Sequence, residues 1–279
     1  MELHTHEFEF IQNLLAQSCG IILSDTKQYL VKNRLSGLLE RYGMGSFSDL
    51  VKALQTTSGG ARIKVDVIEA LTTNETFWFR DDGQFIELTE TVLPELLGKS
   101  GVVRIWSAAC SSGQEPYSIS MCVENAFKKG GKHRNVRIIG TDISEKVLDQ
   151  ARSAVYSEPA LDRGIDAPTR DRFFEPVAKG YRLNPEIAGR VRFQQFNLLK
   201  SFAVLGRFDI IFCRNVLIYF SDEIKRDILN RMAQILEPGG ILFLSSTEVM
   251  VSGVTGFETV RGKRSRYFKK IARSGAAES

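Results

Sequence analysis

The stretch RIWSAACSSGQEPYSIS, residues 104–120, begins with the composition of a buried strand and turns helical after a glutamate and a proline. Between the two, seven of the nine residues from Ser107 to Glu115 are Ser, Ala, Cys or Gly. Small side chains, with Gly113 among them, let a ligand approach the backbone N–H groups of a loop, and the helix that follows can offer its dipole. We therefore expect a ligand on this loop.

Short β-rich runs surround this stretch and alternate with helical stretches at residues 145–154 and 221–236. Such alternation predicts parallel strands with right-handed crossovers, hence an α/β sheet covered on both faces. Two runs near the end, FETV and RSRYFKKI, follow Gly256 and Gly262 and can pair as a hairpin on the sheet edge. The main runs are VVRIWSAA (102–109), VRIIGTDI (136–143), VRFQQFNLL (191–199), FDIIFCRN (208–215) and GILFLSS (240–246).

The first 75 residues show helical periodicity instead and predict a small all-helical bundle. The first helix covers residues 7–20 and ends at Gly20, and the second runs from 27 to 42. Ser46 can cap a third helix, and residues 63–71 supply a fourth. The expected inward stripe of the first helix is Phe10, Leu14, Leu15 and Cys19, and that of the second is Leu30, Val31, Leu35, Leu38 and Leu39.

The composition excludes several classes of protein. No stretch approaches the roughly 20 apolar residues that span a bilayer, and the beginning lacks the regions of a secretory signal, so we expect a cytoplasmic protein. A net charge of +4 is too small to indicate nucleic acid. The cysteines have no metal-ligand spacing and the three histidines lie in polar surroundings, so we expect buried free thiols and no metal.

Ligands of a doubly wound sheet bind beyond the carboxyl ends of the strands, where the strand order reverses. The loop after the first strand has neither the G-x-G-x-x-G of a dinucleotide site nor a phosphate-binding P-loop. Glu115 would repel a phosphate but suits an ammonium or sulfonium group. Asp142 follows the second strand, where a carboxylate can accept hydrogen bonds from ribose hydroxyls. Asn197 and Leu198 follow the third and can border an adenine.

An adenosine with a positive charge and no phosphate describes S-adenosylmethionine. The tight loop CRNVLIYF follows the fourth strand; it contains Arg214 and leads to Tyr219. Each residue also has a plain structural alternative: Asp142 as a helix cap or loop residue, Arg214 as the partner of a nearby carboxylate, and Tyr219 as a core tyrosine. The prediction of an S-adenosylmethionine site therefore depends on the whole set of residues, which follow consecutive strands in the expected order.

Five blocks of the sequence resemble the signatures of the CheR chemotaxis receptor methyltransferases, and the resemblance covers nearly the whole chain. It implies a Rossmann-like class I S-adenosylmethionine-dependent methyltransferase sheet, mostly parallel with an antiparallel edge strand, preceded by the small helical domain. The blocks are TTNETFWFRD (72–81), WSAACSSGQEPYSI (106–119), TDIS (141–144), NLL (197–199) and FCRNVLIYF (212–220).

The resemblance implies transfer of a methyl group from S-adenosylmethionine to glutamate side chains on the cytoplasmic helical bundles of chemoreceptors. The products are glutamyl methyl esters and S-adenosylhomocysteine, and the process is sensory adaptation in chemotaxis. Asn74, Thr76 and Arg80 would close over the methionine end, Glu115 would face the amino group, and Asp142 the ribose. Asn197 and Leu198 would border the adenine, the segment Cys213–Arg214 would line the reacting centre, and Arg80 and Tyr219 would position the substrate.

The domains expected on this basis are a receptor-docking domain over 1–75, a linker and active-site segment over 76–89, and a methyltransferase domain over 90–273. An insertion at about 156–190 lies inside the last, and 274–279 is a disordered tail. Some family members grip a receptor peptide with a glycine-rich loop in that insertion. The corresponding stretch of this chain, FFEPVAKGYRLNP (173–185), looks a few residues shorter and has only Gly180, so we expect no dependence on a peptide tether.

A glutamate carboxylate is ionised at neutral pH, so methyl transfer needs orientation and exclusion of water rather than a general base. The block TTNETFWFRD allows a second interpretation, with Thr73 or Asn74 as a cap and Phe77 and Phe79 as packing anchors. The second helix, with Lys27, Lys32, Arg34 and Arg41, can be a solvated face or a receptor contact, and the basic segment 261–273 has the same two interpretations.

Three other functions compete. One is a protein that binds S-adenosylmethionine without turnover, as a sensor or scaffold. The others are a methyltransferase of RNA or small molecules and, as the weakest, a nicotinamide dehydrogenase. We expect a monomer that binds no nucleic acid and does not insert into membranes.

Overall fold

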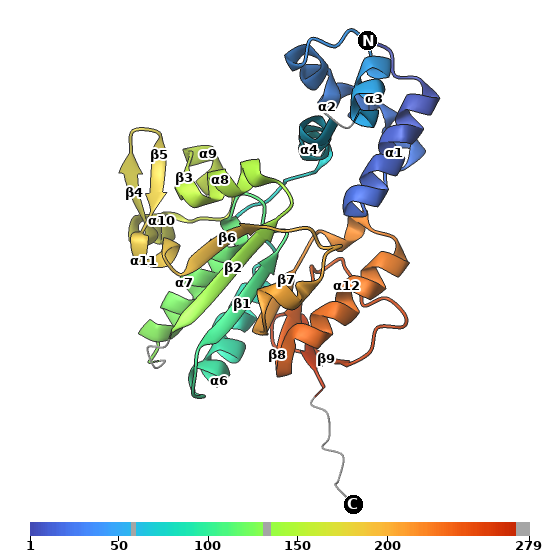
Figure 1. Ribbon diagram of the computed structural model, residues 1–279. Helices are drawn as coiled ribbons and strands as arrows, with labels where there is room; N and C mark the ends of the chain where they lie inside the picture. Colours follow the sequence, from blue (N-terminus) through green and yellow to red (C-terminus); the bar gives the residue numbers. More distant parts are fainter. Residues whose placement is uncertain (57–59, 131–134, 272–279) are drawn as a thin grey trace, which may run out of the picture. The chain divides into compact units, whose positions relative to one another are not determined.

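The computed structural model describes residues 1–56, 60–130 and 135–271 (Figure 1). The chain divides into two compact units. The first holds residues 1–73 and 219–224, and the second holds Asn74–Ile218 and the chain from Lys225 onward.

The first unit is a bundle of helices, as the periodicity predicts. Gly20 ends α1 in the left-handed conformation, with φ of 77°, and the Ser46 side chain caps α3 by accepting a hydrogen bond from the Asp49 N–H at 3.2 Å. The helices are α1 (Thr5–Cys19), α2 (Gln28–Arg41), α3 (Phe47–Gln55) and α4 (Gly60–Leu71), with a 3-10 turn, η1 (Asp25–Lys27), before α2.

The inward face of α1 differs from the predicted one. Phe8, Ile11, Leu15 and Cys19 are buried, whereas Phe10 and Leu14 are only half-buried. The prediction for Phe10 and Leu14 was therefore wrong, because a stripe begun two residues earlier follows the same helical spacing through Leu15 and Cys19. In α2 the expected residues are buried except Leu30, which is half-buried.

The second unit is built on a seven-stranded sheet whose order is β6-β2-β1-β7-β8-β10-β9. The five strands from β6 to β8 are parallel, and β10 runs antiparallel to both β8 and β9. The predicted strands and the predicted edge hairpin are thus confirmed. Their bounds are β1 (Val103–Ala108), β2 (Val136–Asp142), β6 (Val191–Gln195), β7 (Phe208–Cys213), β8 (Leu236–Phe243), β9 (Phe257–Arg261) and β10 (Arg266–Lys270).

The strand order reverses at β1, because β2 and β6 lie on one side of it and β7 and β8 on the other. Both β1 and β7 have an almost continuous buried run, which is typical of parallel strands covered on both faces. The carboxyl ends of β1 and β7 therefore flank the point where this fold binds ligands.

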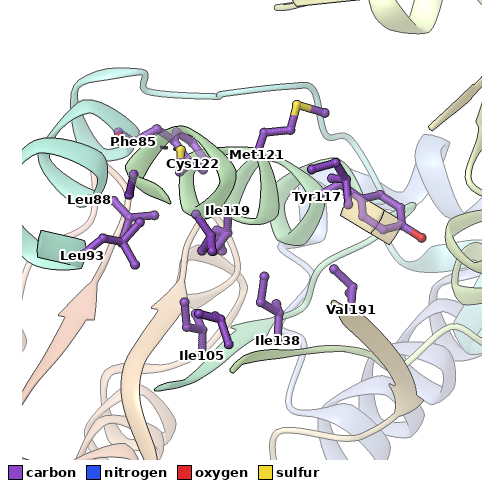
Figure 2. Packing of buried hydrophobic residues seen from close by; sticks show 14 of the residues in the cluster. Phe85, Leu88, Leu93, Ile105, Tyr117, Ile119, Met121, Cys122, Ile138 and Val191 are labelled. Carbon is purple, nitrogen blue, oxygen red and sulfur yellow. Dashed lines mark hydrogen bonds between the residues drawn. The ribbon is translucent and has the colours of Figure 1, made fainter. Parts of the chain in front are cut away.

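Helix α7 (Gln114–Lys128) covers the middle of one face of the sheet. Figure 2 shows Ile119 of α7 above Ile105 of β1 and Ile138 of β2, with Tyr117 toward Val191 of β6. This packing fixes the start of α7, and with it the loop that leads from β1. The other helices are α5 (Gly83–Glu87), a π-helical turn η2 (Leu88–Val92), α6 (Leu93–Leu97), α8 (Glu145–Ser153), η3 (Phe202–Leu205), η4 (Leu217–Tyr219) and α12 (Asp222–Ile235).

Two of the expected segment boundaries can be compared with these elements. The expected start of the methyltransferase domain at residue 90 falls inside the helical stretch from Gly83 to Leu97. The expected insertion contains a separate three-stranded antiparallel sheet, coloured yellow in Figure 1, of order β3-β5-β4. Its elements are β3 (Val155–Tyr156), α9 (Glu158–Leu161), α10 (Ala167–Phe173), β4 (Phe174–Val177), β5 (Gly180–Leu183) and α11 (Pro185–Ala188). The expected tail, 274–279, lies outside the described residues.

No helix within residues 1–56, 60–130 and 135–271 combines the length and the apolar character needed to cross a membrane.

Candidate cofactor site

The carboxyl ends of β1, β2 and β7 lie level with one another. Ala108 of β1 stands opposite Thr141 of β2 on one side and Cys213 of β7 on the other. The loops that begin at these residues therefore meet at one edge of the sheet, as the sequence predicts.

The loop after β1 turns through a series of left-handed residues. Ala109 and Ser111 have φ of 57° and 50°, and Gly113, the N-cap of α7, has φ of 93°. A Cβ on Gly113 would lie 2.8 Å from the Cβ of Ala151 and 3.1 Å from the Tyr156 hydroxyl. Close packing within the protein therefore accounts for Gly113, and the approach of a ligand is not needed to explain it.

Asp142 lies at the end of β2 and is tied to the β1 loop. Its Oδ2 accepts a hydrogen bond from the Ser111 N–H at 2.8 Å, and its Oδ1 accepts one from the Ser144 N–H at 3.0 Å. Ser144, not Asp142, is the N-cap of α8, so the capping alternative for Asp142 is wrong. Burial raises the pKa of Asp142 above its ordinary value, and the hydrogen bonds from Ser144 and Ser111 oppose that shift.

The loop after β6 lies next to Asp142. The Phe196 N–H donates to the Asp142 carbonyl at 2.8 Å, and the Asn197 side chain accepts from the Leu199 N–H at 2.9 Å. Leu198 is buried, and its carbonyl accepts from the Arg231 guanidinium. The structure thus brings the predicted ribose and adenine residues together.

Glu115, in the first turn of α7, is held at both carboxylate oxygens. Oε1 accepts from the Ser107 hydroxyl at 2.7 Å, and Oε2 accepts from the Arg214 guanidinium at 3.0 Å. The side chain keeps 12% of its surface exposed. A carboxylate oxygen has lone pairs for more than one donor, so Glu115 retains acceptor capacity for a cationic ligand.

Arg214 is the buried centre of this site, with 1% of its side chain exposed. Besides Glu115, its guanidinium pairs with Asp81 at 2.9 Å, donates to the Arg80 carbonyl, and lies over the Phe85 ring. The alternative that Arg214 pairs with a carboxylate is therefore confirmed. Its Nε is buried and has no partner among the described residues.

The segment 74–81 is anchored to the same loop through its backbone. The Asn74 carbonyl accepts from the Ser111 hydroxyl at 2.7 Å, and the Phe79 N–H donates to the Ser118 hydroxyl at 3.1 Å. Trp78 is the fully buried anchor and packs edge-on against Tyr156. Phe79 is half-buried and packs against the core, edge-on to Phe85, so the packing role predicted for it is confirmed. Phe77 is also half-buried, and its ring lies beneath the Arg80 and Arg163 guanidinium groups.

The remaining predicted residues differ in their surroundings. Arg80 lies over the Phe77 ring at 5.3 Å, and its guanidinium donates to the Glu75 carbonyl at 3.4 Å. Thr76 is half-buried on the same segment. Cys213 is fully buried, and this burial raises the pKa of its thiol well above the ordinary value. Tyr219 belongs to the first unit, where its carbonyl accepts from the Ile22 N–H. A joint role of Tyr219 and Arg80 stays a prediction.

Two carboxylates at this edge of the sheet are not among the predicted residues. Asp81 directly follows the selected Arg80 and shares the Arg214 guanidinium. Glu248, which lies just beyond β8, is buried and accepts hydrogen bonds from the backbone N–H groups of Asn215, Leu217 and Ser245. It thereby fixes the loops after β7 and β8. Glu248 follows a strand run, which is the signal that selected Asp142.

The groups at this edge fit S-adenosylmethionine. Two carboxylates, Asp142 and Glu115, suit hydroxyl and cationic groups, and the one buried guanidinium is already paired with carboxylates. Such a set would repel a phosphate. Among the described residues no cluster of His, Cys, Asp and Glu could hold a metal ion.

Two protein-family models match the chain. "CheR methyltransferase, all-alpha domain" matches residues 6–72, and "CheR methyltransferase, SAM binding domain" matches residues 74–266.

Named relatives agree with these matches. The chain is 47% identical over 249 residues to chemotaxis protein methyltransferase 1 of Pseudomonas aeruginosa, covering 88% of this chain and 90% of the relative. It is 44% identical over 257 residues to a chemotaxis protein methyltransferase of Vibrio anguillarum, covering 91% and 93%. A third relative, chemotaxis protein methyltransferase Cher2 of Pseudomonas putida, is 43% identical over 249 residues, covering 88% and 90%.

Proposed function

The chain belongs to the CheR methyltransferase family and carries that family's S-adenosylmethionine-binding domain, and from this premise we propose that it methylates glutamate side chains of chemoreceptors. The products would be glutamyl methyl esters and S-adenosylhomocysteine. The observation that carries the proposal is a pair of hydrogen-bonded carboxylates at the strand-order reversal, the buried Asp142 and the half-buried Glu115.

Each part of the site has a role in binding. Asp142 has spare acceptor capacity for the ribose hydroxyls, with Asn197 and Leu198 beside it for the adenine. Glu115 would accept from the amino group of the methionine end, and Asn74, Thr76 and Arg80 would close over that end. Cys213 and Arg214 would line the site near the reacting centre.

When bound, S-adenosylmethionine supplies an electrophilic methyl group on its sulfonium. A glutamate carboxylate is ionised at neutral pH and attacks this methyl without losing a proton, so no residue of the chain has to act as a base. Arg80, with no carboxylate partner in the described ranges, is available to orient the incoming carboxylate, together with Tyr219. Orientation and exclusion of water are the contributions required of the protein.

The first unit would dock the receptor through α2. Lys27 and Lys32 are exposed, whereas Arg34 donates to the carbonyls of Leu71 and Thr72 at the end of α4. Arg34 therefore has a structural task, and Lys27 and Lys32 are the cations best suited to an acidic helical bundle.

The proposal is tested by mass spectrometry of receptor peptides after incubation with this protein and S-adenosylmethionine. We expect a gain of one CH2 on glutamate-containing peptides and a much lower yield with Arg80→Ala. Methylation on lysine, or on added RNA instead of the receptor, would contradict the proposal. Binding of S-adenosylmethionine with no methylated peptide would favour a sensor or scaffold.

The expectation that no peptide tether is needed is tested in the same assay. A receptor that lacks its C-terminal residues should be methylated as fast as the full-length receptor. A strong loss of rate would show that the three-stranded sheet of the insertion grips the receptor terminus.

A further inference from the structure

Asp81 and Glu115 bind opposite ends of the same buried guanidinium. Arg214 donates through one terminal nitrogen to Asp81 Oδ2 at 2.9 Å and through the other to Glu115 Oε2 at 3.0 Å. Asp81 Oδ2 also lies 3.4 Å from the Ser246 backbone nitrogen, as a weak hydrogen bond. Asp81, Arg214 and Glu115 therefore form a triad that joins the segment 74–81, the loop after β7 and the start of α7.

The triad carries one positive charge and two negative charges, so its net charge is −1. Without Asp81, Arg214 and Glu115 would form a neutral pair. The guanidinium is almost fully buried, Glu115 is mostly buried, and Asp81 keeps 31% of its side chain exposed. Charge differences in such surroundings are screened much less than on the surface.

We propose that Asp81 is a positioning residue that gives the Glu115 side of the site its net negative charge and thereby favours the sulfonium cofactor over the thioether product. Methyl transfer converts the cationic sulfonium of S-adenosylmethionine into the neutral thioether of S-adenosylhomocysteine. The negative charge of the triad therefore strengthens binding of the cofactor but does not strengthen binding of the product. This inference rests on the proposed placement of Glu115 beside the methionine end.

The test is calorimetric measurement of two dissociation constants, for S-adenosylmethionine and for S-adenosylhomocysteine, with wild type and Asp81→Asn. Asn can still accept from Arg214, and it tolerates the left-handed backbone that Asp81 adopts at φ of 56°. We expect Asp81→Asn to shift the ratio of the two affinities by about tenfold in favour of S-adenosylhomocysteine. This is the order of the effect of one unit charge about 10 Å from the sulfonium at an effective dielectric constant of about 20.

Asp82→Asn is the matched control. Asp82 is the next residue in the chain and its side chain is exposed, so the variant loses the same charge at the surface. It should leave the ratio unchanged, since exposed charges are screened by solvent and salt. A purely structural role of Asp81 would weaken both ligands equally and leave the ratio unchanged, which would overturn the inference.

Glu115→Gln separates this inference from the proposed function. If Glu115→Gln leaves both affinities unchanged, Glu115 is not beside the cofactor and the placement itself is wrong. If Glu115→Gln weakens binding but Asp81→Asn does not change the ratio, only the role of Asp81 is refuted.

Discussion

At the scale of single residues, the site depends on carboxylates that the protein already holds in place. Asp142 receives one N–H from the β1 loop and one from the start of α8, so its oxygens are oriented before a ligand binds. Glu115 is fixed by side chains instead, because it accepts from the Ser107 hydroxyl and from the Arg214 guanidinium. Preorganised acceptors reduce the cost of ordering side chains when a ligand binds.

Replacing Asp142 tests the ribose contact. Asp142→Asn removes a charged acceptor, and we expect the affinity for S-adenosylmethionine to fall about tenfold to a hundredfold in calorimetry, as the loss of charge-assisted hydrogen bonds implies. Asp149→Asn, which changes an exposed carboxylate on α8, is the control and should bind normally. Equal affinity of Asp142→Asn and wild type would refute the assignment.

The raised pKa of Asp142 predicts how binding depends on pH. Because the folded pKa lies above the ordinary 3.8, acidification protonates Asp142 in the folded protein before it does so in the unfolded chain. Asp142 therefore contributes more favourably to folding as the pH falls through the folded pKa, while the affinity for the cofactor falls. Affinities measured at decreasing pH should show this loss in wild type and a smaller loss in Asp142→Asn. Parallel curves for the two proteins would contradict it.

The buried thiols give a prediction about reactivity. Burial raises the pKa of Cys110 and Cys213 well above the ordinary value, and that of Cys122 to about 12. These thiols stay protonated at neutral pH, so a thiol reagent should label them slowly in the folded protein and rapidly in urea. Fast labelling of folded protein at any of these three positions, located by peptide mapping, would contradict their burial.

At the scale of elements, the loop between β1 and α7 sets the position of the site. Its left-handed residues let the chain turn sharply between a buried strand and a buried helix. Gly113 is also crowded by Ala151 of α8 and by Tyr156 of the insertion. Two restrictions therefore act on this position: the left-handed backbone and the close packing of neighbouring side chains.

A pair of glycine substitutions separates these two restrictions. Gly113→Ala adds a Cβ 2.8 Å from another side chain at φ of 93°, whereas Gly101→Ala adds one at φ of 102° with nothing within 4 Å. We expect Gly101→Ala to cost about 1 kcal/mol of unfolding free energy and Gly113→Ala about 1–3 kcal/mol more, measured by urea denaturation. Equal costs would show that the crowding around Gly113 relaxes freely.

The sequence predicts the strands and the helical bundle well, because both depend on local periodicity, and the general rule for parallel sheets places Asp142 and Glu115 at one sheet edge. Asp81 escapes such reasoning, because it meets Arg214 across 133 positions of the chain. Glu248 follows a strand, which is a usable signal, but its contact with Asn215, 33 positions away, depends on the folded chain. The stripe of α1 was misassigned because two helical faces both contain Leu15 and Cys19.

At the scale of the whole molecule, the proposed function places cofactor binding and receptor docking in different units of the chain. The second unit holds Asp142, Glu115 and Arg214, and the first holds α2 with Lys32 and with Lys27 at its N-cap. A change on α2 should therefore affect receptor methylation without affecting binding of S-adenosylmethionine.

Charge reversal on α2 tests this division. We expect Lys32→Glu to lower kcat/KM for receptor methylation about threefold to tenfold, the effect of roughly 1 kcal/mol, with less effect at high salt. The affinity for S-adenosylmethionine should stay unchanged. Lys52→Glu, an equal charge change at an exposed position of α3, is the control. If both variants lose kcat/KM equally, the net charge of the protein explains the effect and α2 has no special role. If neither variant loses kcat/KM, α2 is not the docking helix.

Formation of glutamyl methyl esters on chemoreceptors is the reaction we propose for this protein. It is measured most directly by incubating the pure protein with methyl-labelled S-adenosylmethionine and receptor-containing membranes and then treating the membranes with base. We expect labelled methanol to be released from the receptor band, because carboxyl methyl esters hydrolyse in base whereas methylated amines do not. Label that stays on the protein after base treatment, or no transferred label despite calorimetric binding of S-adenosylmethionine, would contradict it.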